Sequence, residues 1–464
     1  MKTKDKLWSL CDRWALVALC VYVAECVLGG SGRWFSFGGL SIRMVLFAVC
    51  FVLTLPSLLQ QIRSLYKIPQ IILCVLLGIY LIIAAFIGVK LGNNPAFIKA
   101  DITSFMALAL LPGYLSVIRN NKNVLLICSV LFYSALALGI ITTGIHFYLA
   151  FASHSGLNAV NDWLNNHSMG GLAKMSTGLQ RIYIRSQIFL QVGLLLGLQK
   201  IWSKKGAARW LLFGAEAIMA YACLMTYTRG FWLGFALSAC FLLVLYPQQW
   251  KHYLSTLGIS ALLLAALFIL SAFAYGKPVA AIEVVNRFDP DLIGGAVFLP
   301  GSTTDPTDGD PTEPTDPFDS DADQAAVQLR QKTLRMLGEK ISDRPLFGNG
   351  LGANLDEIRD DGKTEYTYFD MVMKLGFVGF ILFFGVFFLP AFLLLKNRLC
   401  WLIAKKQIPP DSLQAQNSVL LTAFIGVALT SFLNPFLINP MGTLLVMLLF
   451  AASRCENTIK EKQV

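Results

Sequence analysis

The run IILCVLLGIYLIIAAFIGV occupies residues 71–89 and contains no charged side chain. At about 1.5 Å per residue, a helix of this length spans roughly the 30 Å hydrocarbon core of a bilayer. The whole chain of 464 residues is 56% hydrophobic and only 14% charged. This composition is typical of a protein that crosses the membrane many times, and it excludes an ordinary soluble enzyme.

Eleven further stretches have a similar length and apolar character. Nine of the resulting twelve fall within residues 1–274 and three within residues 367–464. We therefore predict an all-α membrane protein with about twelve transmembrane helices, one large loop at residues 275–366 and a short cytoplasmic tail. The predicted spans lie near residues 14–29, 38–59, 69–89, 101–118, 124–150, 183–201, 209–227, 231–247, 254–274, 367–395, 417–434 and 439–453.

Lysine and arginine are concentrated in alternate connections between the predicted spans. The positive-inside rule assigns such connections to the cytoplasm, so we expect both termini to be cytoplasmic and the loops at 151–182 and 275–366 to lie outside. The net charge of +10 then follows from membrane topology, and no nucleic-acid partner is predicted. The basic residues that set this orientation are Arg63, Lys67, Arg119, Lys122, Lys204, Lys205, Arg209, Lys396, Arg398, Lys405, Lys406, Lys460 and Lys462.

The cysteine and histidine patterns give no sign of a disulfide framework or a metal centre. None of the ten cysteines falls in either outer loop, and the four histidines show no ligand spacing such as His-x-x-x-His. Structural disulfides and zinc sites depend on such groupings. We therefore predict neither a metal nor another cofactor.

The first part of the large outer loop is acidic and rich in proline. Residues 289–323 contain ten acidic side chains, no lysine or arginine, and the run DPTDGDPTEPTDP at 305–317. Repeated proline and like charge predict an extended insert without helix or strand. Its aspartates also leave calcium binding open as an alternative.

The second part of this loop, residues 324–343, has the pattern of an amphipathic helix that Asp323 caps and Pro345 ends. Such a helix would lie on the membrane surface, with Arg330 facing whatever the apolar side packs against. Simple contact between its arginines and lipid phosphates is the alternative. The predicted face carries Arg330, Leu334, Leu337 and Ile341.

A second informative site is the turn TYTRGFWLG at residues 226–234, between two predicted spans. Arg229 has apolar helix on both sides, and an arginine within a membrane is costly, so it is usually functional and paired with an anion. Arg181 and Arg185 enter the sixth predicted span, at residues 183–201, from the same side, and their spacing of four residues would place them on one helical face. Together with Arg330 these arginines could form a cationic pocket for a lipid-linked pyrophosphate. The alternative is a snorkelling arginine that anchors a helix end.

These residues resemble the motifs of the O-antigen ligase and polymerase superfamily of GT-C type integral membrane glycosyltransferases. The resemblance rests on Tyr227-Thr-Arg-Gly230, on Arg330 fifteen residues before Pro345, on PLFGNGLG at 345–352 and on Gly376-Phe-Val-Gly379. It implies transfer of a glycan from undecaprenyl pyrophosphate to an acceptor glycan or glycolipid, at the outer face of a bacterial cytoplasmic membrane. It also implies that Arg229 and Arg330 hold the pyrophosphate, without a metal or a nucleotide sugar.

The chain departs from the family pattern at residue 365. The family often has a histidine eleven residues before the glycine that matches Gly376, whereas this chain has Glu365. A carboxylate can also accept a proton from the acceptor hydroxyl, especially when burial raises its pKa. We predict Glu365 as the general base, with Asp370 as the second choice, and Arg330 as the group that stabilises the departing pyrophosphate. This arrangement predicts inversion at the anomeric carbon.

Three tyrosines near the predicted site, Tyr183, Tyr366 and Tyr368, could contact sugar rings or form an interfacial aromatic belt. Two further functions compete with a ligase. A repeat-unit polymerase would share the fold, donor and arginines, and would differ only in its acceptor. A twelve-span transporter is the more distant alternative, because the two halves of the chain show no similarity to one another.

Overall fold

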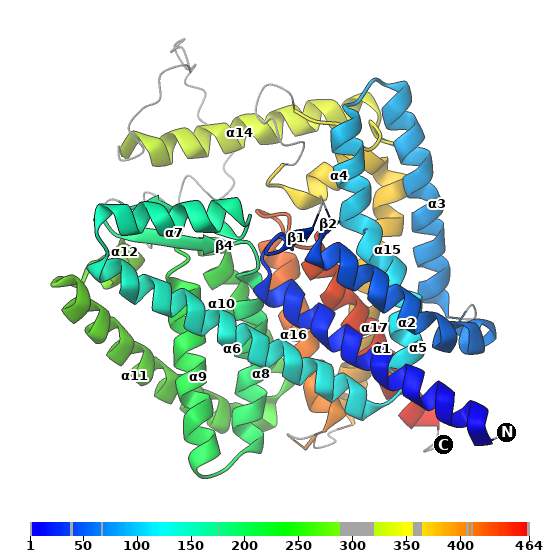
Figure 1. Cartoon of the computed structure of the whole chain (residues 1–464), viewed down its shortest axis with the longest axis horizontal. Coiled ribbons are helices and arrows are strands. Elements are labelled where there is room, and N and C mark those ends of the chain that lie inside the picture. Colours follow the sequence, from blue (N-terminus) through cyan, green and yellow to red (C-terminus); the bar gives the residue numbers. More distant parts are fainter. Residues whose placement is uncertain are drawn as a thin grey trace.

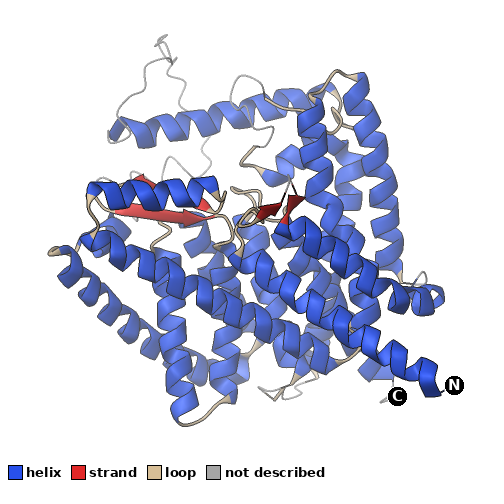
Figure 2. Ribbon diagram, in the orientation of Figure 1, coloured by secondary structure: helices blue, strands red, loops and turns tan. Residues whose placement is uncertain are grey.

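The computed structural model describes residues 2–37, 40–65, 68–175, 177–287, 320–355, 364–404, 408–409 and 412–461. Helices dominate these ranges (Figure 2), and eight of them are long and apolar enough to cross a membrane. The prediction of a mainly helical membrane protein is thus confirmed. Each predicted span overlaps at least one helix, but α8 (Ile188–Ser203) and α10 (Arg229–Leu245) have only 16 and 17 residues. Helices α1 (Lys2–Leu28) and α17 (Pro440–Glu461) also fall outside the set of eight.

The elements follow one another along the chain in a mainly helical order. The first half contains α1 (Lys2–Leu28), β1 (Ser36–Phe37), β2 (Leu40–Ser41), α2 (Ile42–Leu65), α3 (Pro69–Lys90), α4 (Pro95–Met106), the 3-10 helix η1 (Ala107–Leu110), α5 (Leu111–Val117), α6 (Asn121–Phe151), α7 (His154–Asn166), β3 (Gly170–Lys174), β4 (Gln180–Ile184), α8 (Ile188–Ser203) and α9 (Ala207–Leu224). The second half contains α10 (Arg229–Leu245), the 3-10 helix η2 (Pro247–Gln249), α11 (Trp250–Tyr275), α12 (Val279–Asn286), α14 (Ser320–Asp343), α15 (Thr367–Ile403), α16 (Leu413–Thr430) and α17 (Pro440–Glu461).

Helix α16 forms the centre of the bundle. It packs against α8, α10 and α17, and 83% of its apolar window is buried. Small residues allow this close packing, because a side chain at Gly234 or Gly426 would collide with the facing helix. Helix α11 lies at the opposite extreme, with only 6% of its window buried. Its apolar surface is therefore suited to contact with lipid.

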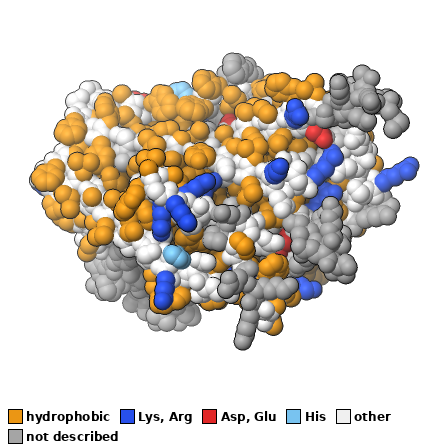
Figure 3. Space-filling model, turned by 90° about the horizontal axis from the view of Figure 1, so that it is seen from below, with side chains coloured by type: hydrophobic (Ala, Val, Ile, Leu, Met, Phe, Trp, Pro, Cys, Tyr) orange, Lys and Arg blue, Asp and Glu red, His pale blue; other side chains and the backbone are white. Residues whose placement is uncertain are grey.

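The polar segments that carry the predicted site lie at one end of the bundle. Helix α14 crosses the top of Figure 1, above α7 and the β3–β4 hairpin, while the start of α1 and the end of α17 lie together at the lower right. Figure 3 shows the molecule from below, where lysine and arginine side chains clearly outnumber acidic ones. The lower face of the described structure is therefore basic.

The β3–β4 hairpin corrects one sequence prediction. A helical span was expected from residue 183, but Gln180–Ile184 is a strand that pairs antiparallel with Gly170–Lys174, and α8 begins only at Ile188. Alternation decides the structure here: Ile182 and Ile184 are buried on one face, as expected for a half-buried strand. This alternation of buried and exposed residues is short, and the long apolar run of α8 follows directly after it. The sequence pattern therefore indicated a helix.

Helix α15 is interrupted near its beginning. Gly376 has φ 63° and ψ −177°, so Thr367–Leu375 forms a short outer segment and the long apolar helix starts after it. The left-handed φ and the close approach of Leu346 and Gly348 leave no space for a side chain at this position. The glycine thus marks the place where the outer segment turns into the bundle.

The loop PLFGNGLG at residues 345–352 connects this break to α3. The backbone N–H groups of Phe377 and Val378 donate to the carbonyl oxygens of Pro345 and Leu346, at 2.8 and 3.1 Å. On the other side, the Leu351 N–H donates to the Ala84 carbonyl of α3 at 2.9 Å. The Asn93 side chain also donates to carbonyls of the loop. The loop therefore clamps α3 and α15 together and fixes the end of α14.

We expect Gly350→Ala to destabilise the protein by more than about 1 kcal/mol. Gly350 has φ +77°, and an added Cβ would collide with the backbone of Gly88 in α3. The matched control is Gly338→Ala in α14, where no atom lies within 4 Å of an added Cβ, so helix propensity should stabilise the protein by about 0.5–1 kcal/mol. Thermal unfolding of both variants in detergent tests the prediction, and equal melting temperatures would contradict it.

Candidate functional site

Arg229 is the first residue of α10, directly after a tight turn. In this turn Tyr227 has φ 48° and is buried, although left-handed backbone is rare for a bulky residue and costs about 1–3 kcal/mol. The Tyr227 hydroxyl lies 3.4 Å from the Ala280 carbonyl of α12. The neighbouring Gly230 packs near Thr430 and Asn434 beyond α16. The surrounding structure thus holds the turn, and with it Arg229, in one position.

Arg181 of β4, in the β3–β4 hairpin, forms two hydrogen bonds to the same turn. Its Nε donates to the Thr226 carbonyl at 2.6 Å, and its second terminal nitrogen donates to the Thr228 hydroxyl at 2.9 Å. Arg181 and the segment before Arg229 are therefore in direct contact. The structure thus brings Arg181 to the turn that precedes Arg229, although Arg181 comes from a strand and not from the predicted helix.

Two further arginines influence Arg181 electrostatically. The pKa of Arg181 is lowered, first by burial and then by the like charges of Arg287 and Arg330. Arg287 follows α12, and its guanidinium lies 3.8 Å from the Met175 sulfur at the tip of the hairpin. Sequence reasoning missed Arg287, although it is the only lysine or arginine between residues 278 and 329. The sequence signal for a functional Arg287 was its position as a single basic residue directly before the long acidic insert.

Arg330 and Glu365, which were predicted to share the site, form an ion pair. The Arg330 Nε lies 3.3 Å from the Glu365 Oε2, and the two side chains are 46% and 33% exposed. Arg330 comes from α14, and Glu365 lies two residues before α15. The principal predicted base and one predicted pyrophosphate ligand are therefore in contact in this structure.

A small apolar cluster holds the two backbones that carry this pair. Leu337 of α14 packs with Tyr366 and Met373, while Leu334 and Ile341 border the same cluster. The apolar face predicted for residues 324–343 is thus present, on a helix that begins at Ser320. The apolar face of α14 therefore packs against other residues of the protein, and not against lipid alone. Burial raises the pKa of Tyr366, and the charges of Arg330 and Glu365 act on it in opposite directions.

Asp370, the second predicted base, lies in a buried ionic cluster. Its Oδ2 is 3.1 Å from the Lys374 Nζ, which is also 3.0 Å from the Asp101 Oδ1 of α4. The other Asp101 oxygen accepts a hydrogen bond from the Gly352 N–H at 2.8 Å. The three side chains are nearly inaccessible to solvent, so this position suits a structural role better than proton transfer to an acceptor. Sequence reasoning missed Asp101, whose signal was an acid at the start of a predicted span.

The three tyrosines occupy different environments. Tyr183 is 38% exposed, and it lies on the same face of β4 as Arg181 because strand residues alternate. Tyr366 is buried in the cluster under α14. The Tyr368 hydroxyl donates to the Ala428 carbonyl of α16 at 2.8 Å. Tyr183 is therefore the best placed of the three to meet a ligand, and the exposed Arg185 follows it at the end of the strand.

The described residues contain no group of three or more histidine, cysteine or acidic side chains arranged to hold a metal ion. The acidic insert expected at 289–323 lies mostly outside the described residues, apart from its last four positions in α14. Anionic ligands at this end of the described structure would thus meet guanidinium groups. Arginine binds phosphate oxygens through paired N–H donors, which favours a phosphate or pyrophosphate group.

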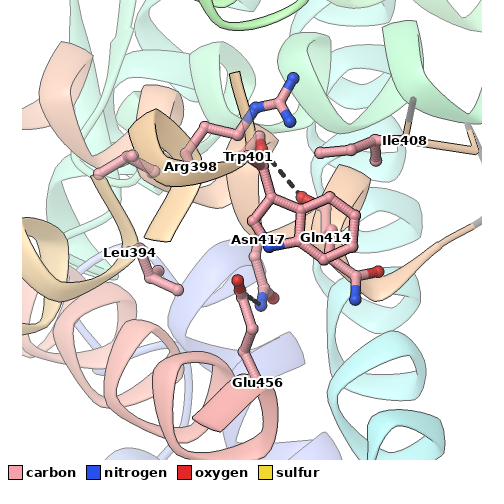
Figure 4. A pocket seen from close by; sticks show the side chains of 9 residues that line it. Leu394, Arg398, Trp401, Ile408, Gln414, Asn417 and Glu456 are labelled. Atoms are coloured by element: carbon pink, nitrogen blue, oxygen red, sulfur yellow. Dashed lines mark hydrogen bonds between the residues drawn. The ribbon is translucent and has the colours of Figure 1, made fainter. Parts of the chain in front are cut away.

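A small pocket lies at the other end of α15, far from these arginines (Figure 4). Arg398 lines it, and about 28 residues of α15 separate this position from Asp370, which corresponds to roughly 40 Å of helix. The Asn417 side chain donates to Glu456 at 2.7 Å in the same pocket. Its polar groups therefore belong to the opposite polar end and do not contribute to the arginine site. The lining residues are Leu394, Arg398, Trp401, Ile408, Gln414, Asn417, Ser418, Leu421 and Glu456.

Comparison with known proteins assigns the segment that contains most of this site. Residues 215–384 match the family described as O-antigen ligase, a segment that includes Arg229, Arg330, Glu365 and the clamping loop. The β3–β4 hairpin with Arg181 lies outside the match. No curated protein matches the chain. Residues 215–384 thus form an O-antigen ligase domain, and this match supports the resemblance to the O-antigen ligase superfamily.

Proposed function

We propose that the protein transfers a glycan from undecaprenyl pyrophosphate to an acceptor sugar at the outer face of the bacterial cytoplasmic membrane. The observation that carries this proposal is the group of arginines at one end of the molecule, beside the carboxylate of Glu365. Arg181 contacts the turn before Arg229, and Arg330 pairs with Glu365. A lipid-linked pyrophosphate supplies the anionic group that such a site would bind.

In this proposal the arginines act on the leaving group. The acceptor hydroxyl attacks the anomeric carbon, a new carbon–oxygen bond forms, and the bond to the pyrophosphate oxygen breaks. The electron pair stays on undecaprenyl pyrophosphate, whose growing negative charge Arg229 and Arg330 stabilise, with Arg181 and Arg287 nearby. Glu365 accepts the proton of the acceptor hydroxyl. Attack opposite to the leaving group inverts the configuration at this carbon.

The proposal includes a membrane topology. Twelve spans, with α1, α8, α10 and α17 added to the eight long apolar helices, place both termini in the cytoplasm and α14 outside. The lysine and arginine side chains of the lower face (Figure 3) support this orientation, because the positive-inside rule assigns such a face to the cytoplasm. The donor lipid would then reach the arginines from the outer leaflet. Tyr183, the exposed tyrosine of β4, is the candidate for sugar contact.

Glycan analysis of cells that lack this protein tests the proposal. We expect long glycan chains to accumulate on undecaprenyl pyrophosphate, because the step that moves them to the final acceptor is missing. Wild-type protein should restore transfer to the acceptor. Single repeat units already attached to the final acceptor would instead identify a repeat-unit polymerase. An unchanged glycan pattern would contradict a glycosyltransferase and favour a transporter.

A further inference from the structure

The Arg330–Glu365 ion pair joins two groups to which the proposed function gives opposite tasks. Arg330 must bind the anionic pyrophosphate, and Glu365 must be free to accept a proton. In this structure the Arg330 Nε and the Glu365 Oε2 are 3.3 Å apart. A carboxylate in this position competes with the donor pyrophosphate for the same guanidinium. Both tasks therefore require this contact to open.

The surroundings of the Arg330–Glu365 pair allow a ligand to replace the Glu365 carboxylate. Its two side chains are 46% and 33% exposed, and exposed ion pairs contribute little to stability. The backbones on both sides are fixed, because Leu337 of α14 packs with Tyr366 in a common cluster. A ligand could thus replace the Glu365 carboxylate by side-chain rotation alone, without moving α14 or α15.

The neighbouring arginines explain why an anion beside Arg330 is favourable. Arg330 and Arg287 both repel the charge of Arg181. A carboxylate beside Arg330 offsets this repulsion until a more highly charged anion arrives. A pyrophosphate carries more negative charge than a carboxylate, and its oxygens match the paired donors of a guanidinium.

We infer that the Arg330–Glu365 pair is a latch that the donor pyrophosphate opens. The inference rests on the proposed function. Binding of the pyrophosphate to Arg330 displaces the Glu365 carboxylate, which then accepts the proton of the acceptor hydroxyl as the new carbon–oxygen bond forms and the pyrophosphate leaves. The donor thus increases the fraction of Glu365 that is released to act as the base, which favours binding of the donor before the acceptor.

Binding of farnesyl pyrophosphate to the full-length protein in detergent tests the latch. This compound stands for the polyprenyl pyrophosphate part of the donor, and calorimetry without divalent cations gives its dissociation constant. We expect Glu365→Gln to bind it about two- to fivefold more tightly than wild type, because about 0.4–1 kcal/mol of competing ion pair is removed. The same variant should lose transfer activity, since glutamine cannot accept the proton.

A double-mutant cycle separates the latch from a general effect of negative charge. In an Arg330→Gln background, Glu365→Gln should give no gain in affinity, because the competed arginine is absent. The matched control is Glu339→Gln, which removes a carboxylate paired at 3.2 Å with Arg335 on the same helix and should leave affinity unchanged.

Two results would overturn the inference in different ways. Equal affinities of wild type and Glu365→Gln, together with weaker binding by Arg330→Gln, would reject the latch and retain the donor site. A wild-type protein that does not bind farnesyl pyrophosphate, or an Arg330→Gln variant that binds it equally well, would reject the donor site itself and the latch with it.

Discussion

Arg229→Ala and Arg330→Ala are each expected to reduce glycan transfer about 100- to 1000-fold, the usual effect of removing one group that stabilises a developing anion. Each change removes a guanidinium from the proposed pyrophosphate site. Arg229 begins α10 after a turn that Arg181 holds, and Arg330 is exposed on α14. Transfer should be measured in membranes that contain equal amounts of each variant, with lipid-linked glycan as the donor.

Arg335→Ala provides the matched control for this experiment. Arg335 lies on the same helix as Arg330, and its side chain is 84% exposed in a pair with Glu339. If positive charges on α14 supported transfer only through contact with lipid, Arg335→Ala would also reduce transfer. Normal glycan from the Arg229 or Arg330 variant, with the protein present in the membrane, would remove these residues from the donor site.

Lys374→Ala is expected to have the largest effect on stability. The change leaves Asp101 and Asp370 buried without their shared counter-charge, because the Lys374 Nζ lies 3.0 and 3.1 Å from their oxygens. Removing one partner of a buried ion pair costs about 3–5 kcal/mol, which is a large part of the 5–15 kcal/mol that stabilises a typical protein. The expected result is a strongly lowered melting temperature in detergent and little protein in the membrane.

Two control variants make this result specific. Lys332→Ala changes an exposed lysine of α14 and should alter stability by less than about 0.5 kcal/mol. Combining Lys374→Met with Asp101→Asn and Asp370→Asn removes the whole charge cluster, and the stability should recover in large part. An unchanged melting temperature for Lys374→Ala would show that the cluster does not hold α4 and α15 together.

The sequence predicted the helical architecture better than it predicted local structure outside the apolar runs. Long uncharged runs such as residues 71–89 have only one stable form in a bilayer, so their helices were predictable. The β3–β4 hairpin was not, since its alternation covers only a few residues next to the start of α8. The break at Gly376 was signalled by the glycine, but its role depends on a loop 30 residues earlier in the chain.

The candidate site was predictable in its residue types and less so in its contacts. Arg229 was predicted because an arginine between apolar spans needs a partner, and Arg330 because it lies on the amphipathic helix predicted in the large loop. The pairing of Arg330 with Glu365, and the burial of Asp370 with Asp101, join segments 35 and 269 residues apart in the sequence. Such contacts depend on how the helices pack, which local patterns do not specify.

The most direct test of the central claim is transfer by the purified protein in liposomes. The donor is undecaprenyl-pyrophosphate-linked glycan, the acceptor is the glycolipid that carries the glycan in the cell, and both products are quantified together. We predict equal amounts of glycosylated acceptor and free undecaprenyl pyrophosphate, with neither formed by Arg330→Ala. Wild-type protein that forms neither product, or an Arg330→Ala variant that forms both at the wild-type rate, would contradict the account.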